Sequence, residues 1–128
     1  MTGDLTKRTT AEVLAHHNKY LQGGDLEETL RDYLPDSVII NMGGPVVGID
    51  AIRAFFADSI KNCLPPETTY ETLQCYVHGE MAYITWTADS PYYAVPYGTD
   101  TFFVQDGKIV RQTFAGILSK KEKSGDQK

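Results

Sequence analysis

The second half of the chain reads as strands joined by short turns, and the helical patterns all lie before it. Residues 68–78, 81–89 and 98–105 are rich in Thr, Tyr, Val and Phe, with turns at Gly79-Glu80 and Asp106-Gly107. β-Branched and aromatic residues favour strands, and Asp-Gly between apolar runs is typical of a hairpin. Helices first and antiparallel strands afterwards predict an α+β domain whose strongly bent sheet wraps around the helices as an open cone.

Three segments before residue 68 carry helix signals. Thr9 and Glu12 fit a capping box for a helix that stops at residues 23–24. Asp25 caps a second helix, which Pro35 ends, and a third helix spans residues 49–62. The apolar stripe of the first helix is Val13, Leu14, His17 and Leu21, and that of the second is Leu26, Leu30, Tyr33 and Leu34.

Shorter segments complete the predicted domain. Residues 37–41 form a short strand, residues 42–48 a glycine-rich connection, and residues 90–96 a tyrosine-rich segment before the next strand. Residues 111–118 close the sheet. We therefore expect one domain over residues 1–118 and a disordered charged tail over residues 119–128.

Composition excludes several classes of partner and site. The net charge is −5, which suits neither phosphate backbones nor anionic lipid, so neither nucleic acid nor membrane is expected as a partner. No apolar run is long enough to span a membrane, and the N-terminus does not resemble a secretory signal. Cys63 and Cys75 lack the spacing of metal ligands or of a disulfide framework. We expect a cytoplasmic protein whose site needs no metal and no organic cofactor.

Asp100 is the residue that most needs an explanation. It lies in the predicted strand in phase with Phe102 and Val104, and an ionised carboxylate on a core-facing position costs several kcal/mol unless it is compensated. A two-residue turn at residues 106–107 would place Asp100 opposite Thr113, and a three-residue loop would place it opposite Gln112. We prefer the second, because it keeps Arg111 off the face that carries Phe102.

The preferred register groups polar and aromatic side chains around one cavity. The polar members are Asp100, Gln112, Asn41 and His17, and the walls are Trp86, Phe102, Phe114, Tyr33 and Phe55. A carboxylate and an imidazole in a cavity of low dielectric constant shift each other's pKa values, which produces proton donors and bases that work near neutral pH. Each residue also has a purely structural interpretation: His17 as a satisfied core residue, Asn41 as a turn residue, Gln112 as a network partner and the rings as core.

The order of these segments resembles the SnoaL-like branch, which includes polyketide cyclases and ketosteroid isomerases, of the nuclear-transport-factor-two-like superfamily. The resemblance covers residues 10–118 and rests on GGDLE, YLPDSV, VVGIDAIRAFF and GTDTFFVQDGKIVRQTF in that order. It implies a cystatin-like, cone-shaped α+β barrel with one deep pocket. The resemblance implies that three residues of this chain occupy the positions of functional residues in the steroid isomerases of this branch. His17 takes the position of a tyrosine, Asn41 that of the base aspartate, and Asp100 that of a protonated aspartic acid. Asn41 cannot accept a substrate proton, so we do not expect that isomerase mechanism here.

Two functions of different classes follow. In the first, Asp100 and His17 catalyse acid/base isomerisation, cyclisation or dehydration of a mostly apolar carbonyl compound, with Asn41 or Gln112 donating a hydrogen bond to the developing oxyanion. In the second, the pocket only binds an apolar ligand or is structural, and the sheet forms a homodimer. Val38 and Ile40 are as apolar as Ile39, so both faces of that strand are expected to be covered. A cavity of several hundred Å³ that reaches both Asp100 and His17 would favour the first function or ligand binding, and a pocket plugged by Trp86 and Phe114 would favour a structural role.

Overall fold

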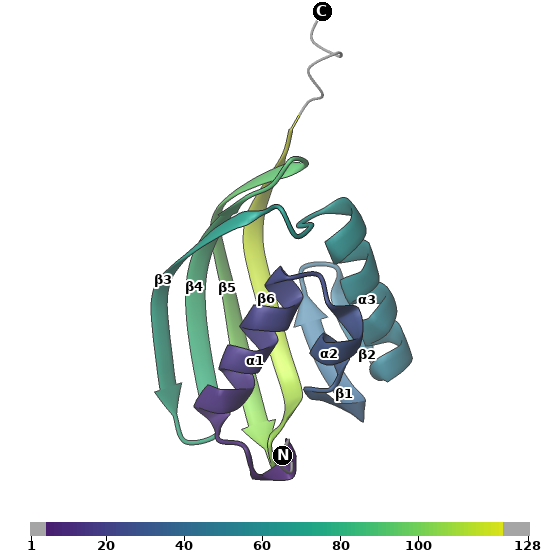
Figure 1. Cartoon of the computed structure of the whole chain (residues 1–128), viewed down its shortest axis with the longest axis vertical. Helices are drawn as coiled ribbons and strands as arrows, with labels where there is room; N and C mark the ends of the chain where they lie inside the picture. Colours follow the sequence, from purple (N-terminus) through teal and green to yellow (C-terminus); the bar gives the residue numbers. More distant parts are fainter. Residues whose placement is uncertain (1–4, 122–128) are drawn as a thin grey trace, which may run out of the picture.

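The computed structural model describes residues 5–121 as helices packed on one side of a curved sheet (Figure 1). Its elements are η1 (Leu5–Lys7), α1 (Thr10–Gln22), α2 (Leu26–Leu30), β1 (Tyr33–Asn41), β2 (Gly44–Val47), α3 (Ile49–Asn62), β3 (Thr69–His78), β4 (Met81–Asp89), β5 (Tyr93–Gln105) and β6 (Lys108–Lys120). None of the helices within residues 5–121 is long and apolar enough to cross a membrane.

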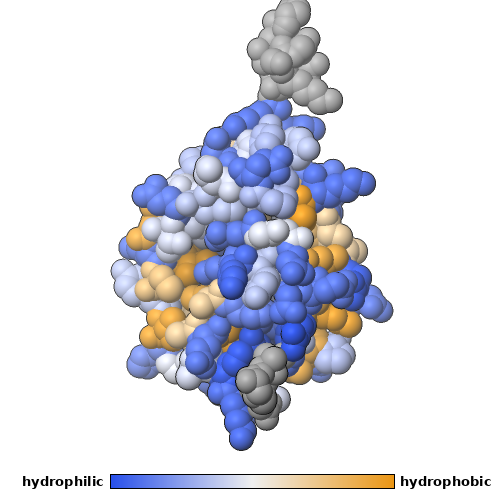
Figure 2. Space-filling view, in the orientation of Figure 1, coloured by the Kyte–Doolittle hydropathy of each residue, from blue (hydrophilic) through white to orange (hydrophobic). Residues whose placement is uncertain are grey.

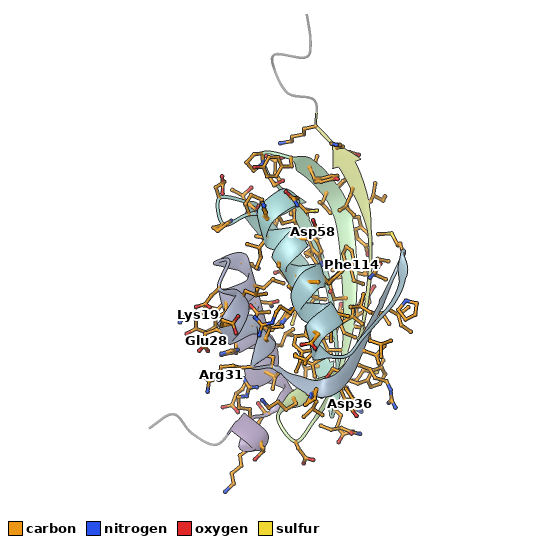
Figure 3. All side chains as sticks on the ribbon, turned by 90° about the vertical axis from the view of Figure 1, so that its right-hand side faces the viewer. Lys19, Glu28, Arg31, Asp36, Asp58 and Phe114 are labelled. Carbon is orange, nitrogen blue, oxygen red and sulfur yellow. The ribbon has the colours of Figure 1, made fainter. Side chains whose placement is uncertain are left out.

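The six strands form one open sheet in the order β2-β1-β6-β5-β4-β3, with β2 and β3 as its edges. All neighbouring pairs are antiparallel except β1 and β6, which are parallel. Figure 3 shows the helices on one side of this sheet and its other side without a helical cover. The predicted α+β class and the bent, mixed sheet are confirmed.

The start of α1 is fixed by the predicted capping box. Thr9 accepts a hydrogen bond from the backbone N–H of Glu12, and the Glu12 carboxylate accepts one from the backbone N–H of Thr9. Thr10 then donates to the carbonyl of Gly79, 2.7 Å away, which ties the helix to the β3–β4 turn. The cap and this tie set where α1 crosses the sheet, and with it the position of His17.

The second helix is shorter than predicted, because β1 begins at Tyr33. Tyr33 pairs with Ile109 of β6, so Tyr33 and Leu34 belong to a strand and not to the helical stripe. Pro35 disfavours the helical conformation for Leu34 as well as for itself, and this favours extended backbone two residues earlier than predicted. Ser37 holds the new strand by donating to the carbonyl of Ile109 at 2.6 Å.

The glycine-rich connection contains a strand that was not predicted. Asn41 pairs with Gly44 in a tight hairpin between β1 and β2. Gly44 has a φ of 112°, a backbone angle that residues other than glycine rarely adopt. The Asn41 side chain accepts a hydrogen bond from the backbone N–H of Gly43 at 2.6 Å. Asn41 therefore has the turn-forming role that was its structural interpretation.

Both ends of the last hairpin extend beyond their predicted limits. The tyrosine-rich segment joins β5 from Tyr93 onward, and β6 continues to Lys120, which pairs with Tyr93. Lys121 also donates its backbone N–H to the carbonyl of Tyr92, at 2.8 Å. The predicted disorder is therefore wrong for residues 119–121, and the rest of the predicted tail, residues 122–128, lies outside the described residues.

The register of β5 and β6 differs from both predicted alternatives. Asp106 and Gly107 form a two-residue turn with φ of 50° and 72°, but the register then shifts beside Phe103, so that Asp100 pairs with Phe114. One extra residue in β6 restores the face that the preferred alternative predicted. Gln112 and Phe114 therefore share the inner face with Asp100, and Arg111 lies on the outer face.

The core lies between the inner face of the sheet and the helices. Its most buried apolar side chains come from α1, β1, α3, β5 and β6, and include Val13, Ile39, Ile52, Phe102 and Ile109. The core packs α1 and α3 against the sheet. The polar residues that open into a cavity lie beside it.

Candidate functional site

A cavity of about 100 Å³, open on one side, lies between the inner face of the sheet and the helices α1 and α3. His17 lines it from α1, Phe55 from α3, and Trp86, Asp100, Phe102 and Phe114 from β4, β5 and β6. Figure 3 labels Phe114 where α3 approaches the sheet. The cavity reaches both Asp100 and His17, but its volume is below the several hundred Å³ expected for a drug-sized ligand.

Asp100 is a buried carboxyl group with a partner on each oxygen. The indole N–H of Trp86 donates to Oδ1 at 2.8 Å, and the amide of Gln112 donates to Oδ2 at 3.0 Å. Burial raises the pKa of Asp100 from 3.8 to about 6, although both hydrogen bonds favour the ionised form and act in the opposite direction. Asp100 therefore changes between its protonated and ionised forms close to neutral pH, inside the cavity.

Gln112 is held in one orientation by its two neighbours. The Tyr33 hydroxyl donates a short hydrogen bond to Oε1 of Gln112, so the amide nitrogen faces Asp100. Burial, together with the negative charges of Asp32 and Asp100, raises the pKa of Tyr33 well above 10.0, which keeps the phenol a donor. The amide of Gln112 has no second partner within the described residues, so one N–H remains for a ligand.

Trp86 forms the wall next to Asp100 because β5 carries no side chain at Gly98. Gly98 pairs with Trp86, and a Cβ at Gly98 would come within 2.6 Å of the indole ring. The ring stacks on Phe114, with centroids 6.0 Å apart and planes at 18°. The glycine thus creates the space in which the indole N–H reaches Asp100.

His17 faces the same cavity but is not paired with Asp100. It is 2% exposed, and the rings of Tyr33, Phe56 and Phe102 surround it edge-on. Burial lowers the pKa of His17 from 6.5 to about 4, with a smaller opposing effect of Asp32, so the ring is neutral at pH 7. No hydrogen bond or ion pair joins His17 to Asp100 among the described residues, so the two groups share the cavity without direct contact.

The structure brings most, but not all, of the predicted residues together. Asp100, His17, Gln112, Trp86, Phe102, Phe114 and Phe55 line the cavity. Tyr33 does not line the cavity and acts on it through its hydrogen bond to Gln112. Asn41 is the clear error: its side chain is used in the β1–β2 turn, and it does not line the cavity.

Sequence reasoning also missed part of the lining. Asn18 and Gln22 lie outside the predicted apolar stripe of the first helix, yet both line the cavity from α1. They directly follow His17 and Leu21 of the apolar stripe, so they stand at its edge, where a cavity mouth meets solvent. Tyr70 and Thr72 of β3 were missed too, although they alternate in phase and pair with Ala88 and Trp86 of the inner face.

The fold is similar to that of NTF2-like proteins in comparisons with solved structures. An NTF2-like protein of unknown function from Mesorhizobium loti has 23% sequence identity, a TM-score of 0.71, and coverage of 91% of this chain and 97% of that one. A proposed ketosteroid isomerase from Kribbella flavida has 15% identity, a TM-score of 0.71 and coverage of 92% and 84%. A proposed SnoaL-like polyketide cyclase from Jannaschia has 12% identity, a TM-score of 0.69 and coverage of 84% of each chain.

The family follows from the sequence model that matches. The model of the SnoaL-like domain matches residues 13–112, which is most of the chain, so this protein belongs to the SnoaL-like domain family. The comparison with curated proteins gives no match. Because the structural relatives are below 25% identity, they support the fold, and the chemistry must be argued from the cavity itself.

Proposed function

We propose that this protein is a cofactor-independent acid/base catalyst that isomerises, cyclises or dehydrates a small, mostly apolar carbonyl compound. The proposal rests above all on Asp100, a buried carboxyl group whose pKa of about 6 lies close to neutral pH and which lines a cavity. General acid/base catalysis works best when the pKa of the group is near the working pH. The relatives named as an isomerase and a cyclase agree with this class of chemistry.

Each polar group in the cavity has a role in the proposed reaction. Asp100, mostly ionised above pH 6, takes a proton from the carbon next to the carbonyl group. The free N–H of Gln112 donates to the carbonyl oxygen as negative charge develops there, and Tyr33 keeps that amide in place. His17, neutral at pH 7, is the second proton-handling group. Asn41, outside the cavity, has no part in this scheme.

The size of the cavity limits the ligand. About 100 Å³ is less than the roughly 150 Å³ apolar cavity that holds a benzene molecule. The enclosed part of a ligand is therefore about one small ring, unless Trp86 and Phe114 move apart. Since the cavity is open on one side, the rest of a longer molecule would extend past Asn18 and Gln22.

Exchange of α-protons tests this proposal without knowledge of the natural substrate. Small cyclic ketones, such as cyclopentanone and 2-cyclohexenone, are incubated with the protein in D2O at pH 7, and deuterium incorporation is followed by NMR. The wild type should exceed the buffer rate, and Asp100→Asn should lose about 100-fold or more of the protein-dependent rate, the usual range for a general base. Thr99→Ala, on the opposite face of β5, is the matched control and should exchange like the wild type.

A second candidate function is binding without chemistry. It is favoured by the hydrogen bonds within the site, because Trp86 and Gln112 already satisfy both oxygens of Asp100. The same experiment separates the two functions. Ketones that bind, as seen by ligand line broadening, but exchange at equal rates in the wild type and Asp100→Asn would leave a binding protein and overturn the catalytic proposal.

We also propose that the uncovered face of the sheet joins two copies of the chain. A row of uncharged residues crosses this face through paired positions: Tyr76, Tyr83, Thr101, Thr113 and Ile40. Ile40 is 52% exposed and Tyr76 61% exposed, so the outer side of β1, predicted to be covered, is not covered within one subunit. An uncharged, Tyr-rich row brings no like charges together when it meets its own copy, and tyrosine is common at interfaces.

A further inference from the structure

Close to His17 lies a second buried carboxylate that sequence reasoning did not single out. Asp32 stands between α2 and β1 and has no exposed surface. Its backbone is fixed on both sides: its N–H donates to Thr29 at 3.2 Å, and its carbonyl accepts from Ile109 at 2.6 Å. The position of this carboxylate is therefore set by the sheet and by α2.

Two cationic or polar groups hold the carboxylate of Asp32. The guanidinium of Arg8 donates to Oδ1 at 2.9 Å. Nδ1 of His16 lies 2.8 Å from Oδ1 and 3.0 Å from Oδ2, and the other nitrogen of His16 lies 3.0 Å from Glu28. Arg31 in turn donates to Glu28 (Figure 3 labels both), and Lys108 donates to the carbonyl of Arg31. A permanently charged arginine at this distance compensates the buried carboxylate.

His17 presents an unsatisfied nitrogen to this carboxylate. Nδ1 of His17 is buried, has no hydrogen-bond partner within the described residues, and lies 3.9 Å from Oδ2 of Asp32. A proton on Nδ1 would point the positive end of the N–H dipole at the carboxylate, which is attractive. A lone pair on Nδ1 would instead face the negative carboxylate, which is repulsive. Because the dielectric constant of this buried site is low, the difference in electrostatic energy between the two tautomers does not require a direct hydrogen bond.

We propose that Asp32 is a positioning residue that fixes the tautomer of His17, with the proton on Nδ1 and with Nε2 left as an unprotonated acceptor on the cavity. Which nitrogen of a neutral histidine carries the proton is set by the partner of the other nitrogen. The inference deepens the proposed function: in the cavity His17 then accepts a proton or a hydrogen bond, and a fitting ligand carries a hydroxyl or enol group there besides its carbonyl group.

The tautomer can be measured directly on the full chain without any ligand. Protein labelled with 15N in its histidine rings is studied at pH 7, and the shifts of both ring nitrogens of His17 are read from long-range 1H–15N spectra. The wild type should show Nδ1 protonated and Nε2 unprotonated. A wild-type spectrum with the proton on Nε2 overturns the proposal, whichever variants fold and whether or not the chain is an enzyme.

Two variants separate positioning from general support of the fold. Asp32→Asn should lose the single Nδ1–H form, giving a mixture or the Nε2–H form, because the amide can donate to Nδ1. Glu28→Gln is the matched control: it disturbs the same cluster beyond His16 and should leave the tautomer of His17 unchanged. A folded Asp32→Asn protein that keeps the wild-type tautomer contradicts the role of Asp32, even if ketone exchange is observed.

Discussion

At the scale of single residues, burial acts on Asp100 and His17 in opposite directions. Burial raises the pKa of Asp100 to about 6 and lowers the pKa of His17 to about 4. Between pH 3.8 and 6 the unfolded chain releases the Asp100 proton before the folded chain does, so rising pH destabilises the fold. Between pH 4 and 6.5 the unfolded chain binds a proton on His17 that the folded chain does not bind, so falling pH destabilises the fold. The two effects therefore oppose each other in the wild type.

Single substitutions should reveal these opposed effects. Each shift corresponds to about 3 kcal/mol. We expect the stability of Asp100→Asn relative to the wild type to rise by about that amount from pH 4 to 7, and that of His17→Gln to fall by a similar amount. Urea unfolding of the three proteins across this range measures both, and differences that do not change with pH would show that neither group is shifted.

At the scale of elements, the sequence indicated most helices and strands but not how they are joined. The capping box of α1, the limits of α3 and the extent of β4 were all predictable, because caps, prolines and alternation are local signals. The start of β1 at Tyr33 and the hairpin at Asn41 depend on pairing with distant strands. Asn41 was misassigned to the site for this reason, and Asn18 and Gln22 were missed because a cavity mouth has no periodic signal.

The side chains that share a face with Asp100 were predicted correctly, although the predicted register between the last two strands was wrong. A bulge beside Phe103 adds one residue to β6, and a shift of one residue changes which side chains face inward. The preferred alternative also contained one extra residue, placed in the turn. Both arrangements keep Arg111 off the apolar face, and this burial requirement is what the sequence could indicate.

The pairing of β4 with β5 gives a prediction about Trp86. Gly98→Ala should push the indole away from Asp100, because the new Cβ would lie 2.6 Å from ring atoms. We expect a loss of about 1–3 kcal/mol in the free energy of unfolding, as in other overpacked cores, and a red-shifted emission of Trp86, the only tryptophan of the chain. Thr99→Ala, next in β5 and on the outer face, should leave the emission unchanged. Unchanged emission in Gly98→Ala would show that the ring is not held by Gly98.

At the scale of the whole molecule, the two sides of the sheet differ in whether helices cover them. The inner side is covered by the helices, and the side of α1 and α2 seen in Figure 2 is largely hydrophilic, with hydrophobic residues toward its flanks. The outer side carries exposed Tyr76, Met81, Tyr83 and Phe103. This contrast fits a subunit whose cavity is complete in itself and whose sheet is covered by a second copy.

A charge at the centre of the outer face should prevent this association. Thr101 pairs with Tyr83 on one side and Thr113 on the other, so Thr101→Arg would place two guanidinium groups in a symmetric interface. Light scattering after gel filtration should give twice the 14.3 kDa chain mass for the wild type and the single mass for Thr101→Arg. Lys61→Glu, on the exposed side of α3, is the control for a change of charge and should stay dimeric. A monomeric wild type contradicts the proposed dimer.

The central claim is that Asp100 is a buried carboxyl group that exchanges its proton near neutral pH inside the cavity. A 13C NMR titration of the aspartate side-chain carboxyl carbons, with Asp100→Asn used to assign the Asp100 signal, measures this most directly. The structure predicts a midpoint at about pH 6 for that signal. A midpoint near 4, the ordinary value of an exposed aspartate, would contradict the account.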